Sequence, residues 1–294
     1  MTISGTSISG TTISGTTRLA GVIGDPVRHS LSPVLHNAAY RELGLDWVFL
    51  AFEVAGGETR GAIDAMRALG LVGLSVTMPH KSAAAECCDE LSDDAAALRG
   101  VNTLSVGADG RIVGDSTDGE GFLRSLRDAG HDPARTSALV IGAGGAARAV
   151  VRALGRAGAS VVVCARNPDA AATAAVLAPN GTSRPWSERS DAAGAATLVV
   201  NATPLGMAGS PRANELPLPV TALRPDQVFA DLVYHPRETP LLLAARDAGV
   251  AVVDGLGMLV HQAALQIERW SGFPAPVATM RAAAEHALSP APTS

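Results

Sequence analysis

The chain has 294 residues, of which 47% are apolar and 17% charged, and it carries a net charge of −5. This length is typical of two ordinary domains, and the lack of a basic excess argues against nucleic acid or an anionic membrane as the main partner. The three cysteines show no metal-ligand spacing, and no stretch approaches the roughly 18 apolar residues of a membrane span. We therefore expect a cytoplasmic globular protein whose partners are small molecules and which holds no metal.

Residues 1–17 form a repetitive extension in which TISGT, SISGT and TISGT follow one another. Ser, Gly and Thr dominate it, and little in it can be buried to offset the entropy lost on ordering. We expect this extension to be disordered.

From residue 18 to residue 117, short apolar runs alternate with helical patterns. Strands are expected at 18–26, 46–52, 73–77, 101–106 and 111–114, and helices at 32–43, at 57–69 and from about residue 82. Ser32 is expected to cap the first helix, with Pro33 at its first position, and Gly70 is expected to stop the second. The alternation predicts an α/β domain with a mostly parallel sheet.

A second domain is expected over residues 118–254. A helix is expected at 119–129, followed by a strand, a glycine-rich turn, a helix and another strand within 137–166. Further strands are expected at 197–203, 227–233 and 250–254, with a helix at 240–249 before the last. This periodicity predicts a doubly wound, Rossmann-like dinucleotide-binding domain. The chain then continues into a helix at 255–270, and we expect residues 255–288 to complete the first domain.

The glycine-rich turn has the spacing of a dinucleotide-binding motif. Its expected cofactor contacts are Gly142, Ala143, Gly144, Gly145 and Ala146. Gly142 permits the tight turn, Gly144 lets the backbone approach a pyrophosphate, and the following helix offers free N–H groups and its positive dipole end.

The end of the next strand distinguishes between the two nicotinamide cofactors. An NAD site usually has an acidic residue there, whereas this chain has Ala165, Arg166 and Asn167. Arg166 can form charge-assisted hydrogen bonds to a 2′-phosphate. The sequence therefore favours NADP over NAD.

Lys81 is the only lysine among the 23 Lys and Arg residues of the chain. Its ammonium can release and regain a proton, whereas a guanidinium stays protonated. Lys81 is therefore a candidate proton-transfer residue.

Three further segments combine polar residues in ways that suit a small anionic substrate. HSLSP (29–33) places two serines at a helix start, where hydroxyl and N–H groups suit a carboxylate. SVTMPHK (75–81) places Thr77 and Lys81 just beyond the end of a strand, the usual edge for ligands in α/β sheets. GDSTDGEG (114–121) places Asp118 at the expected junction of the two domains.

Taken together, these segments make the chain resemble the shikimate dehydrogenase family from about residue 18 to residue 285. Eight pieces stand in family order: HSLSP with His36-Asn37 after it, SVTMPHK, VNTL (101–104), GDSTDGEG, GAGGAAR (142–148), NATPLGM (201–207), DLVY (231–234) and GLGMLVHQ (255–262). The resemblance implies NADPH-dependent, reversible reduction of 3-dehydroshikimate to shikimate in aromatic amino-acid biosynthesis. It also implies two domains, with the last helix returning to the first.

The resemblance also assigns roles to residues. It implies a catalytic pair, Lys81 with Asp118. It implies that the substrate is bound by Ser30, Ser32, Thr77, Asn102, Tyr234 and Gln262. Beyond the glycine turn and Arg166, it implies cofactor contacts at Thr203 and Gly255.

The chain departs from the family pattern at three places. Ser75 and Ser116 stand where the family usually has asparagine, and both keep a shorter hydrogen-bonding side chain. Ala170 stands four positions after Arg166, where a second basic residue is common. One arginine instead of two puts a strict preference for NADP in doubt.

Several alternatives stay open at this point. The main one is a quinate or dual quinate/shikimate dehydrogenase, with or without use of NAD. A remote one is a non-catalytic NADP-binding regulator, which would need the glycine turn but not Lys81 with Asp118. Lys81 either donates the proton itself or orients the substrate while water relays it, and the chain is either a monomer or a homodimer.

Overall fold

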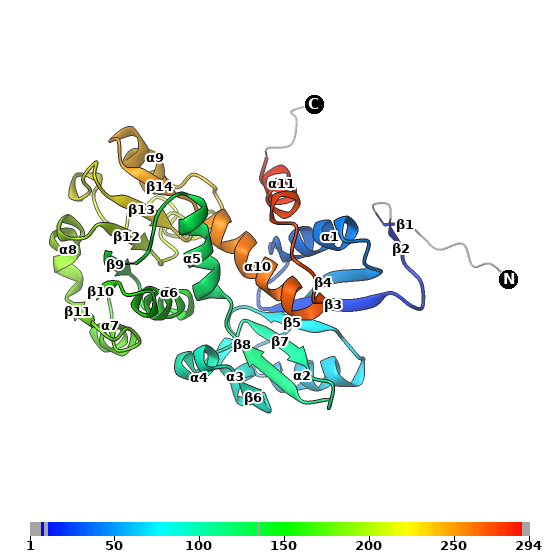
Figure 1. Ribbon diagram of the computed structural model, residues 1–294. Coiled ribbons are helices and arrows are strands. Elements are labelled where there is room, and N and C mark those ends of the chain that lie inside the picture. Colours follow the sequence, from blue (N-terminus) through cyan, green and yellow to red (C-terminus); the bar gives the residue numbers. More distant parts are fainter. Residues whose placement is uncertain (1–6, 9–10, 135, 290–294) are drawn as a thin grey trace. The chain divides into compact units, whose positions relative to one another are not determined.

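The computed structural model describes residues 7–8, 11–134 and 136–289. Contacts divide the chain into two compact units. Unit 1 comprises Met1–Thr117 with Ala263–Ser294, and unit 2 comprises Asp118–Gln262. Each unit has a six-stranded sheet and its own helices (Figure 1), so the predicted two-domain α/β fold class is confirmed.

The sheet of unit 1 has the strand order β4-β3-β5-β7-β8-β6. The bounds are β3 Arg18–Gly24, β4 Trp47–Glu53, β5 Gly73–Val76, β6 Glu90–Leu91, β7 Thr103–Val106 and β8 Ile112–Asp115. β3 runs parallel to β4 and β5, β7 runs antiparallel to β5 and β8, and β6 runs parallel to β8. The sheet is therefore mixed, and β7 and β8 form a hairpin.

Among the described residues, five helices lie wholly within unit 1: α1 Ser32–Glu42, α2 Thr59–Ala68, α3 Lys81–Glu86, α4 Asp93–Leu98 and α11 Val277–Leu288. The prediction that Ser32 caps α1 is wrong, because Leu31 holds the cap position and makes no side-chain capping bond. Instead the Ser32 N–H donates to the Ser30 hydroxyl at 3.2 Å, so the local hydroxyl that satisfies this helix start comes from the turn before it. Gly70 stops α2 with φ +65°, as predicted.

Helix α10 (Gly255–Ser271) joins the end of unit 2 to unit 1, to which its residues from Ala263 onward belong. Trp270 lies against the sheet of unit 1, and its indole N–H donates to the Leu104 carbonyl at 3.1 Å. A Cβ at Gly73 would lie 2.2 Å from the Trp270 ring, so β5 can accept this ring only where it has no side chain. The expected return of the last helix to the first domain is thus achieved by close packing on β5 and β7.

The sheet of unit 2 is wholly parallel, with the order β11-β10-β9-β12-β13-β14. The bounds are β9 Ser137–Ile141, β10 Ser160–Cys164, β11 Gly181–Arg184, β12 Leu198–Asn201, β13 Val228–Asp231 and β14 Ala251–Val253. The chain leaves β9 toward β10 on one side and later returns to β12 on the other, which is the switch point of a doubly wound fold. Ligands bind such sheets at the carboxyl ends of these strands.

Helices cover both faces of this sheet, and two apolar clusters pack against it, one around Val140 and Val150 and the other around Leu139 and Phe229. The helical segments are α5 Asp118–Asp128, α6 Gly145–Arg156, α7 Pro168–Ala175, α8 Arg189–Ala195 and α9 Pro240–Asp247, with the short 3-10 turns η1 Trp186–Glu188 and η2 Val220–Ala222. The side chains of these two clusters are mostly Ala, Val and Leu, as the scarcity of aromatic residues requires.

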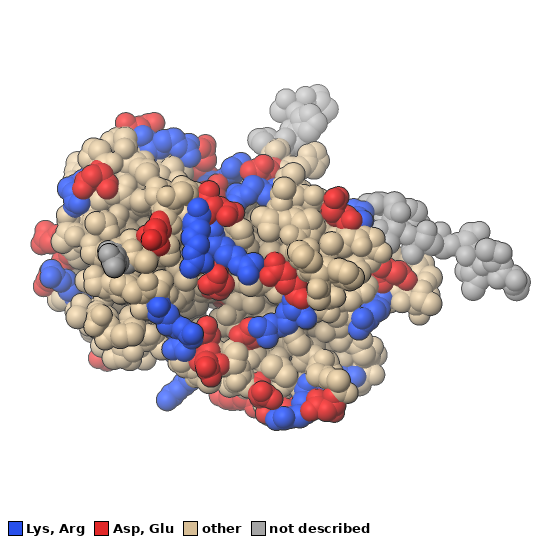
Figure 2. All heavy atoms as spheres, viewed as in Figure 1, with Lys and Arg blue, Asp and Glu red and all other residues tan. Residues whose placement is uncertain are grey.

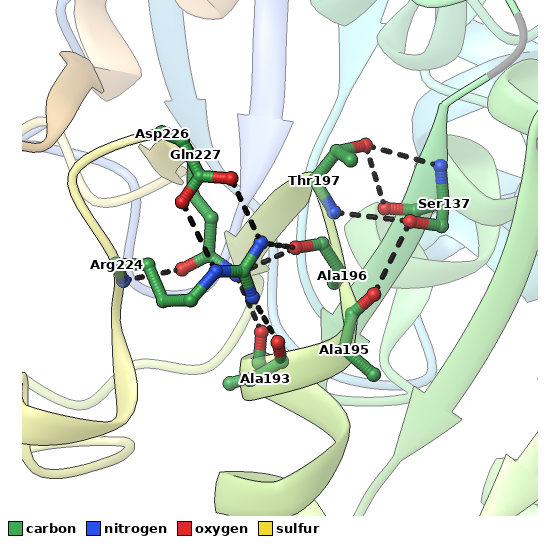
Figure 3. A network of polar contacts seen from close by, with 9 residues as sticks. Ser137, Ala193, Ala195, Ala196, Thr197, Arg224, Asp226 and Gln227 are labelled. Carbon is green, nitrogen blue, oxygen red and sulfur yellow. Dashed lines mark hydrogen bonds and ion pairs between the residues drawn. The ribbon is translucent and has the colours of Figure 1, made fainter.

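The amino ends of β9, β12 and β13 are tied together by the polar network in Figure 3. Thr197, just before β12, and Ser137, the first residue of β9, exchange backbone and hydroxyl hydrogen bonds. Gln227, just before β13, is buried and donates to the Ala193 and Ala196 carbonyls at the end of α8. This network occupies the edge of the sheet opposite the carboxyl ends and leaves the latter for ligands.

The start of the chain was expected to be disordered over residues 1–17, and of these residues 1–6 and 9–10 lie outside the described residues. Ser7–Ile8 (β1) pairs antiparallel with Thr11–Thr12 (β2). The hydroxyls of Thr16 and Thr17 donate to Asp46 at 2.9 and 2.7 Å. The end of the extension nearest β3 is therefore hydrogen-bonded to the turn before β4, and the expectation does not fit it.

Basic and acidic side chains are interspersed on the face of the molecule shown in Figure 2. Among the described residues, none of the helices combines the length and the hydropathy that a membrane span needs.

Candidate functional site

The glycine-rich turn connects β9 to α6 at the switch point of unit 2. Gly142 has φ +120°, and a Cβ there would lie 2.8 Å from the Ala202 carbonyl oxygen, so both the backbone angle and the space require glycine. Gly144 holds the cap position of α6 in an extended conformation, and Gly145 is the first helical residue. Apart from its chain neighbours, no atom of the described residues lies within 4 Å of a Cβ built at Gly144, which leaves room beside the N–H groups at the start of α6.

A pocket of about 540 Å³ opens at this turn, at the carboxyl ends of β9, β10 and β12. Its lining includes five of the expected cofactor contacts, Gly142, Ala143, Gly144, Arg166 and Thr203, and does not include Gly145, Ala146 or Gly255. Sequence reasoning missed two other lining residues, Trp186 and Arg212. A pocket with a helix N-terminus, two guanidinium groups and an aromatic ring fits a phosphorylated dinucleotide.

A buried polar network fixes the loops that follow β12 and β13. The Asn201 amide donates to Asp231 at 2.9 Å, and the Thr239 hydroxyl donates to the other Asp231 oxygen at 2.8 Å. The Thr203 hydroxyl donates to the Asn201 side chain at 2.7 Å, which orients Thr203 at the pocket. Burial raises the pKa of Asp231 to about 6. The signal in the sequence was an aspartate at the end of an apolar strand, DLVY, to which sequence reasoning had given no role.

In unit 1, the chain topology brings four loops to one edge of the sheet. β3 and β5 are parallel neighbours, so the loops after them begin at the same edge. Thr103 pairs with both Ser75 of β5 and Asp115 of β8, so the start of β7 and the end of β8 lie there too. The residues that these loops carry to the edge are Ser30, Ser32, Thr77, Lys81, Asn102 and Thr117.

Lys81 is the first residue of α3, and the backbone on both sides of it is fixed. The preceding His80 is 1% exposed and lies between the Thr59 hydroxyl and the Val54 carbonyl, each at 2.8 Å. The Lys81 carbonyl accepts from the Val101 N–H at 3.0 Å. His80 therefore has a structural role, because it holds the turn that places Lys81.

Asn102 lies in the centre of a buried hydrogen-bond network. Its amide donates to the Thr117 hydroxyl at 2.9 Å, and its carbonyl oxygen accepts from the Thr117 N–H at 2.8 Å and from the Thr103 hydroxyl at 2.8 Å. Gln266 of α10 donates to the Asn102 backbone carbonyl at 3.1 Å and to the Thr103 hydroxyl at 3.0 Å. The Ser75 hydroxyl donates to Gln266 at 2.7 Å. The shorter Ser75 is thus accommodated by a glutamine from α10, which sequence reasoning missed.

The two serines of the first motif lie where β3 leads into α1. Ser30 is partly buried and Ser32 is 7% exposed. His36, one turn further along α1, is buried, stacks on Phe49 at 3.9 Å between ring centroids and has a ring nitrogen 2.8 Å from the Ser32 carbonyl. Burial lowers the pKa of His36 to about 4, so this ring is neutral and packs as a core aromatic group.

The remaining expected site residues lie in unit 2. Asp118 is the first residue of α5 and is buried, and Gly255 is the first residue of α10. Gln262 is nearly buried, and its amide donates to the Leu259 carbonyl at 2.8 Å. Burial raises the pKa of Tyr234, so its phenol stays protonated. Lys81 and Asp118 belong to different units, and their pairing stays a prediction.

Comparison with known proteins places this geometry in a family. The model of the shikimate dehydrogenase substrate binding domain matches residues 22–104, and that of the shikimate 5'-dehydrogenase C-terminal domain matches residues 255–285. A shikimate dehydrogenase (NADP(+)) from Methanopyrus kandleri is 46% identical over 278 residues, covering 91% of this chain and 94% of the relative.

Solved structures agree with the sequence comparison. A shikimate dehydrogenase in complex with NADP+ superposes with a TM-score of 0.90 at 32% identity, over 97% of this chain and all of the other. The shikimate 5-dehydrogenase of Thermus thermophilus, in complex with NADP(H) and shikimate, gives 0.85 at 35% identity, with 92% and 100% covered. A quinate dehydrogenase from Corynebacterium glutamicum in complex with NAD gives 0.85 at 31% identity, with 92% and 99% covered. With matches of this identity and coverage, the chain belongs to the shikimate dehydrogenase family.

Proposed function

We propose that this chain catalyses the reversible, NADPH-dependent reduction of 3-dehydroshikimate to shikimate in aromatic amino-acid biosynthesis. The observation that carries the proposal is the edge of the unit 1 sheet, where two serines, a threonine, an asparagine and the only lysine are gathered. In this proposal residues 18–117 and 255–288 bind the substrate, and residues 118–254 bind NADP.

The pocket of unit 2 supports the cofactor assignment. The N–H groups at the start of α6 would hold the pyrophosphate, Arg166 would hold the 2′-phosphate, and Thr203 would add a contact from the same pocket. Gly255 does not line this pocket, and its cofactor contact rests on the family resemblance. When bound, the nicotinamide supplies a hydride to the ketone, or accepts one from the alcohol.

Lys81 and Asp118 would perform the proton transfer. Negative charge develops on the ketone oxygen as it is reduced, and a positioned ammonium both stabilises this charge and gives up a proton to it. Asp118 would orient the ammonium, and its carboxylate by itself favours the charged amine. Arginine in place of Lys81 could stabilise the charge but could not supply the proton.

Substrate recognition would use groups of matching polarity. Ser30 and Ser32 would bind the carboxylate with their hydroxyls, and Tyr234 would lie near it. Thr77, Asn102 and Gln262 would bind the ring hydroxyls. Among these residues, the assignment of Asn102 has the most structural support, because its contacts with Thr117 and Thr103 fix the orientation of its side-chain amide.

Steady-state kinetics with shikimate and quinate, each with NADP+ and NAD+, test the proposal. The expected result is a much higher kcat/KM for shikimate with NADP+ than for the other three combinations. A preference for quinate with NAD+ would instead support the second candidate, a quinate dehydrogenase, to which the likeness of the Corynebacterium glutamicum structure points. Cofactor binding without turnover of either acid would refute the catalytic assignment.

The cysteines Cys87, Cys88 and Cys164 are free thiols, which suits a reducing cytoplasm. We propose that the chain works there as a monomer or a homodimer.

A further inference from the structure

The chain has one arginine where members of its family commonly have two basic residues. Arg166 follows β10, and Ala170, on the first turn of α7, cannot supply a second charge. Both residues line the pocket at the glycine turn. A doubly charged 2′-phosphate bound by Arg166 alone would keep about half of its charge uncompensated.

We propose that Arg212, from the loop after β12, is the second cation for the 2′-phosphate, and that Glu215 holds it in place while no phosphate is bound. The inference rests on the proposed use of NADP and names a residue that selects it. Arg212 lines the same pocket as Arg166, from the other side of β9 along the sheet.

The side chain of Arg212 is already engaged with an anion. Its Nε donates to one Glu215 oxygen at 2.8 Å, and its Nη2 donates to the other at 2.5 Å, so the guanidinium presents its paired donors to a carboxylate. The pKa of Glu215 is lowered, first by this hydrogen bond and also by the charges of Arg212 and Arg166. The carboxylate of Glu215 therefore lies in the field of both arginines, as a 2′-phosphate would.

The loop that carries Arg212 is folded by its own hydrogen bonds. The Arg212 N–H donates to the Ser210 hydroxyl at 3.1 Å, and the Arg212 carbonyl accepts from the Glu215 N–H at 3.1 Å. The Ala208 N–H donates to the His235 carbonyl at 2.8 Å, which ties the loop to the segment after β13. The backbone of Arg212 is thus positioned, and only its side chain has to exchange one anion for another.

The competition between the Glu215 carboxylate and the 2′-phosphate for Arg212 determines how much Arg212 adds to the affinity for the phosphate. The Glu215 side chain is 51% exposed and that of Arg212 is 34% exposed, so water screens their ion pair and a dianion can displace the carboxylate. Loss of the Arg212 charge removes charge-assisted hydrogen bonds to the phosphate, partly offset because Glu215 no longer competes. We expect an affinity loss of about tenfold.

The test is calorimetric binding of 2′,5′-ADP and 5′-AMP to the full chain, because these two ligands differ only in the 2′-phosphate. Arg212→Gln should weaken binding of 2′,5′-ADP about tenfold and leave 5′-AMP unchanged. Glu215→Gln should strengthen binding of 2′,5′-ADP only, since it frees Arg212. Arg166→Gln with Arg212→Gln should bind the two ligands equally. The matched control is Arg246→Gln, which breaks the surface pair of Arg246 with Glu238, outside the pocket, and should change neither affinity.

Three results would overturn the inference. Unchanged binding of 2′,5′-ADP by Arg212→Gln would mean that this arginine does not reach the phosphate. Equal weakening of both ligands would mean that Arg212 shapes the pocket without recognising the phosphate. If the unaltered chain itself bound the two ligands equally, the NADP assignment would fail, and the inference with it. That failure can be distinguished from the first two results because it is seen in the unaltered chain, whereas they are seen only in Arg212→Gln.

Discussion

The contact between Ser75 and Gln266 gives the most direct test of how α10 supports the candidate substrate site. Gln266 is 1% exposed and makes three hydrogen bonds, to the Ser75 hydroxyl, the Thr103 hydroxyl and the Asn102 carbonyl. Gln266→Leu keeps the approximate volume and removes all three. A buried polar group left without a partner costs about 1–3 kcal/mol, and the two hydroxyls can rotate toward other acceptors. We expect the free energy of unfolding to fall by about 3 kcal/mol.

Ser75→Ala leaves one Gln266 oxygen unpaired and should lower the free energy of unfolding by about 1–2 kcal/mol. Since the Ser75 hydroxyl has no role once Gln266 is gone, the double variant should lose about 3 kcal/mol, less than the sum of the single losses. Urea unfolding followed by tryptophan fluorescence measures these values. Ser105→Ala is the matched control, because the Ser105 hydroxyl is buried and, within the described residues, has no hydrogen-bond partner.

The same variants connect stability to function. Because Gln266 fixes Asn102, Gln266→Leu should raise the KM for shikimate and leave the KM for NADP+ unchanged. The reasoning is refuted if Ser75→Ala destabilises the chain no more than Ser105→Ala does, or if the losses of the two single variants simply add in the double variant.

Three further predictions follow from the residues described above. Lys81→Arg should keep the charge and lose turnover by about 100-fold or more, and near-normal kcat in stopped assays would exclude a proton-donating role. Ser30→Ala with Ser32→Ala should raise the KM for shikimate strongly, whereas an unchanged KM would place the carboxylate elsewhere. Asp231 has a pKa raised by burial from 3.8 to about 6, so between these pH values the folded chain holds a proton that the unfolded chain has lost. The free energy of unfolding should therefore fall as the pH rises from about 4 to 6, by an amount on the order of 3 kcal/mol. Urea midpoints across this range should show a smaller fall for Asp231→Asn than for the unaltered chain, and identical slopes would contradict the assignment.

The secondary structure was predictable wherever the pattern was local. Apolar runs of strand length, the glycine turn at Gly142 and the stop at Gly70 all lie within a few residues of the elements that they define. The predicted cap at Ser32 was wrong because the Ser30 hydroxyl accepts the Ser32 N–H at the start of α1, and sequence alone does not decide which of two neighbouring serines satisfies a helix start. The short β6 and β11 have weak patterns of their own and exist because a neighbouring strand offers hydrogen bonds.

In the candidate site too, local motifs were predictable from the sequence and long-range contacts were not. The motifs around Lys81, Asn102 and the glycine turn are contiguous in the chain, so the sequence could identify them. Gln266 contacts Ser75 across 191 residues of sequence, and Arg212 reaches the pocket of Arg166 from a different loop. No periodicity predicts either contact.

By itself, the sequence determined most of the strands and helices, the alternation that makes the sheet of unit 2 parallel, and the chemical groups available to the site. The tertiary structure decided which distant side chains support those groups. Gln266 hydrogen-bonds to Ser75, which stands where the family usually has asparagine, and Arg212 lines the pocket in which Ala170 occupies the place of a second basic residue. The physical reason is that backbone preference and hydrophobic periodicity act over a few residues, whereas hydrogen bonds and ion pairs between loops depend on where packing brings the chain back upon itself.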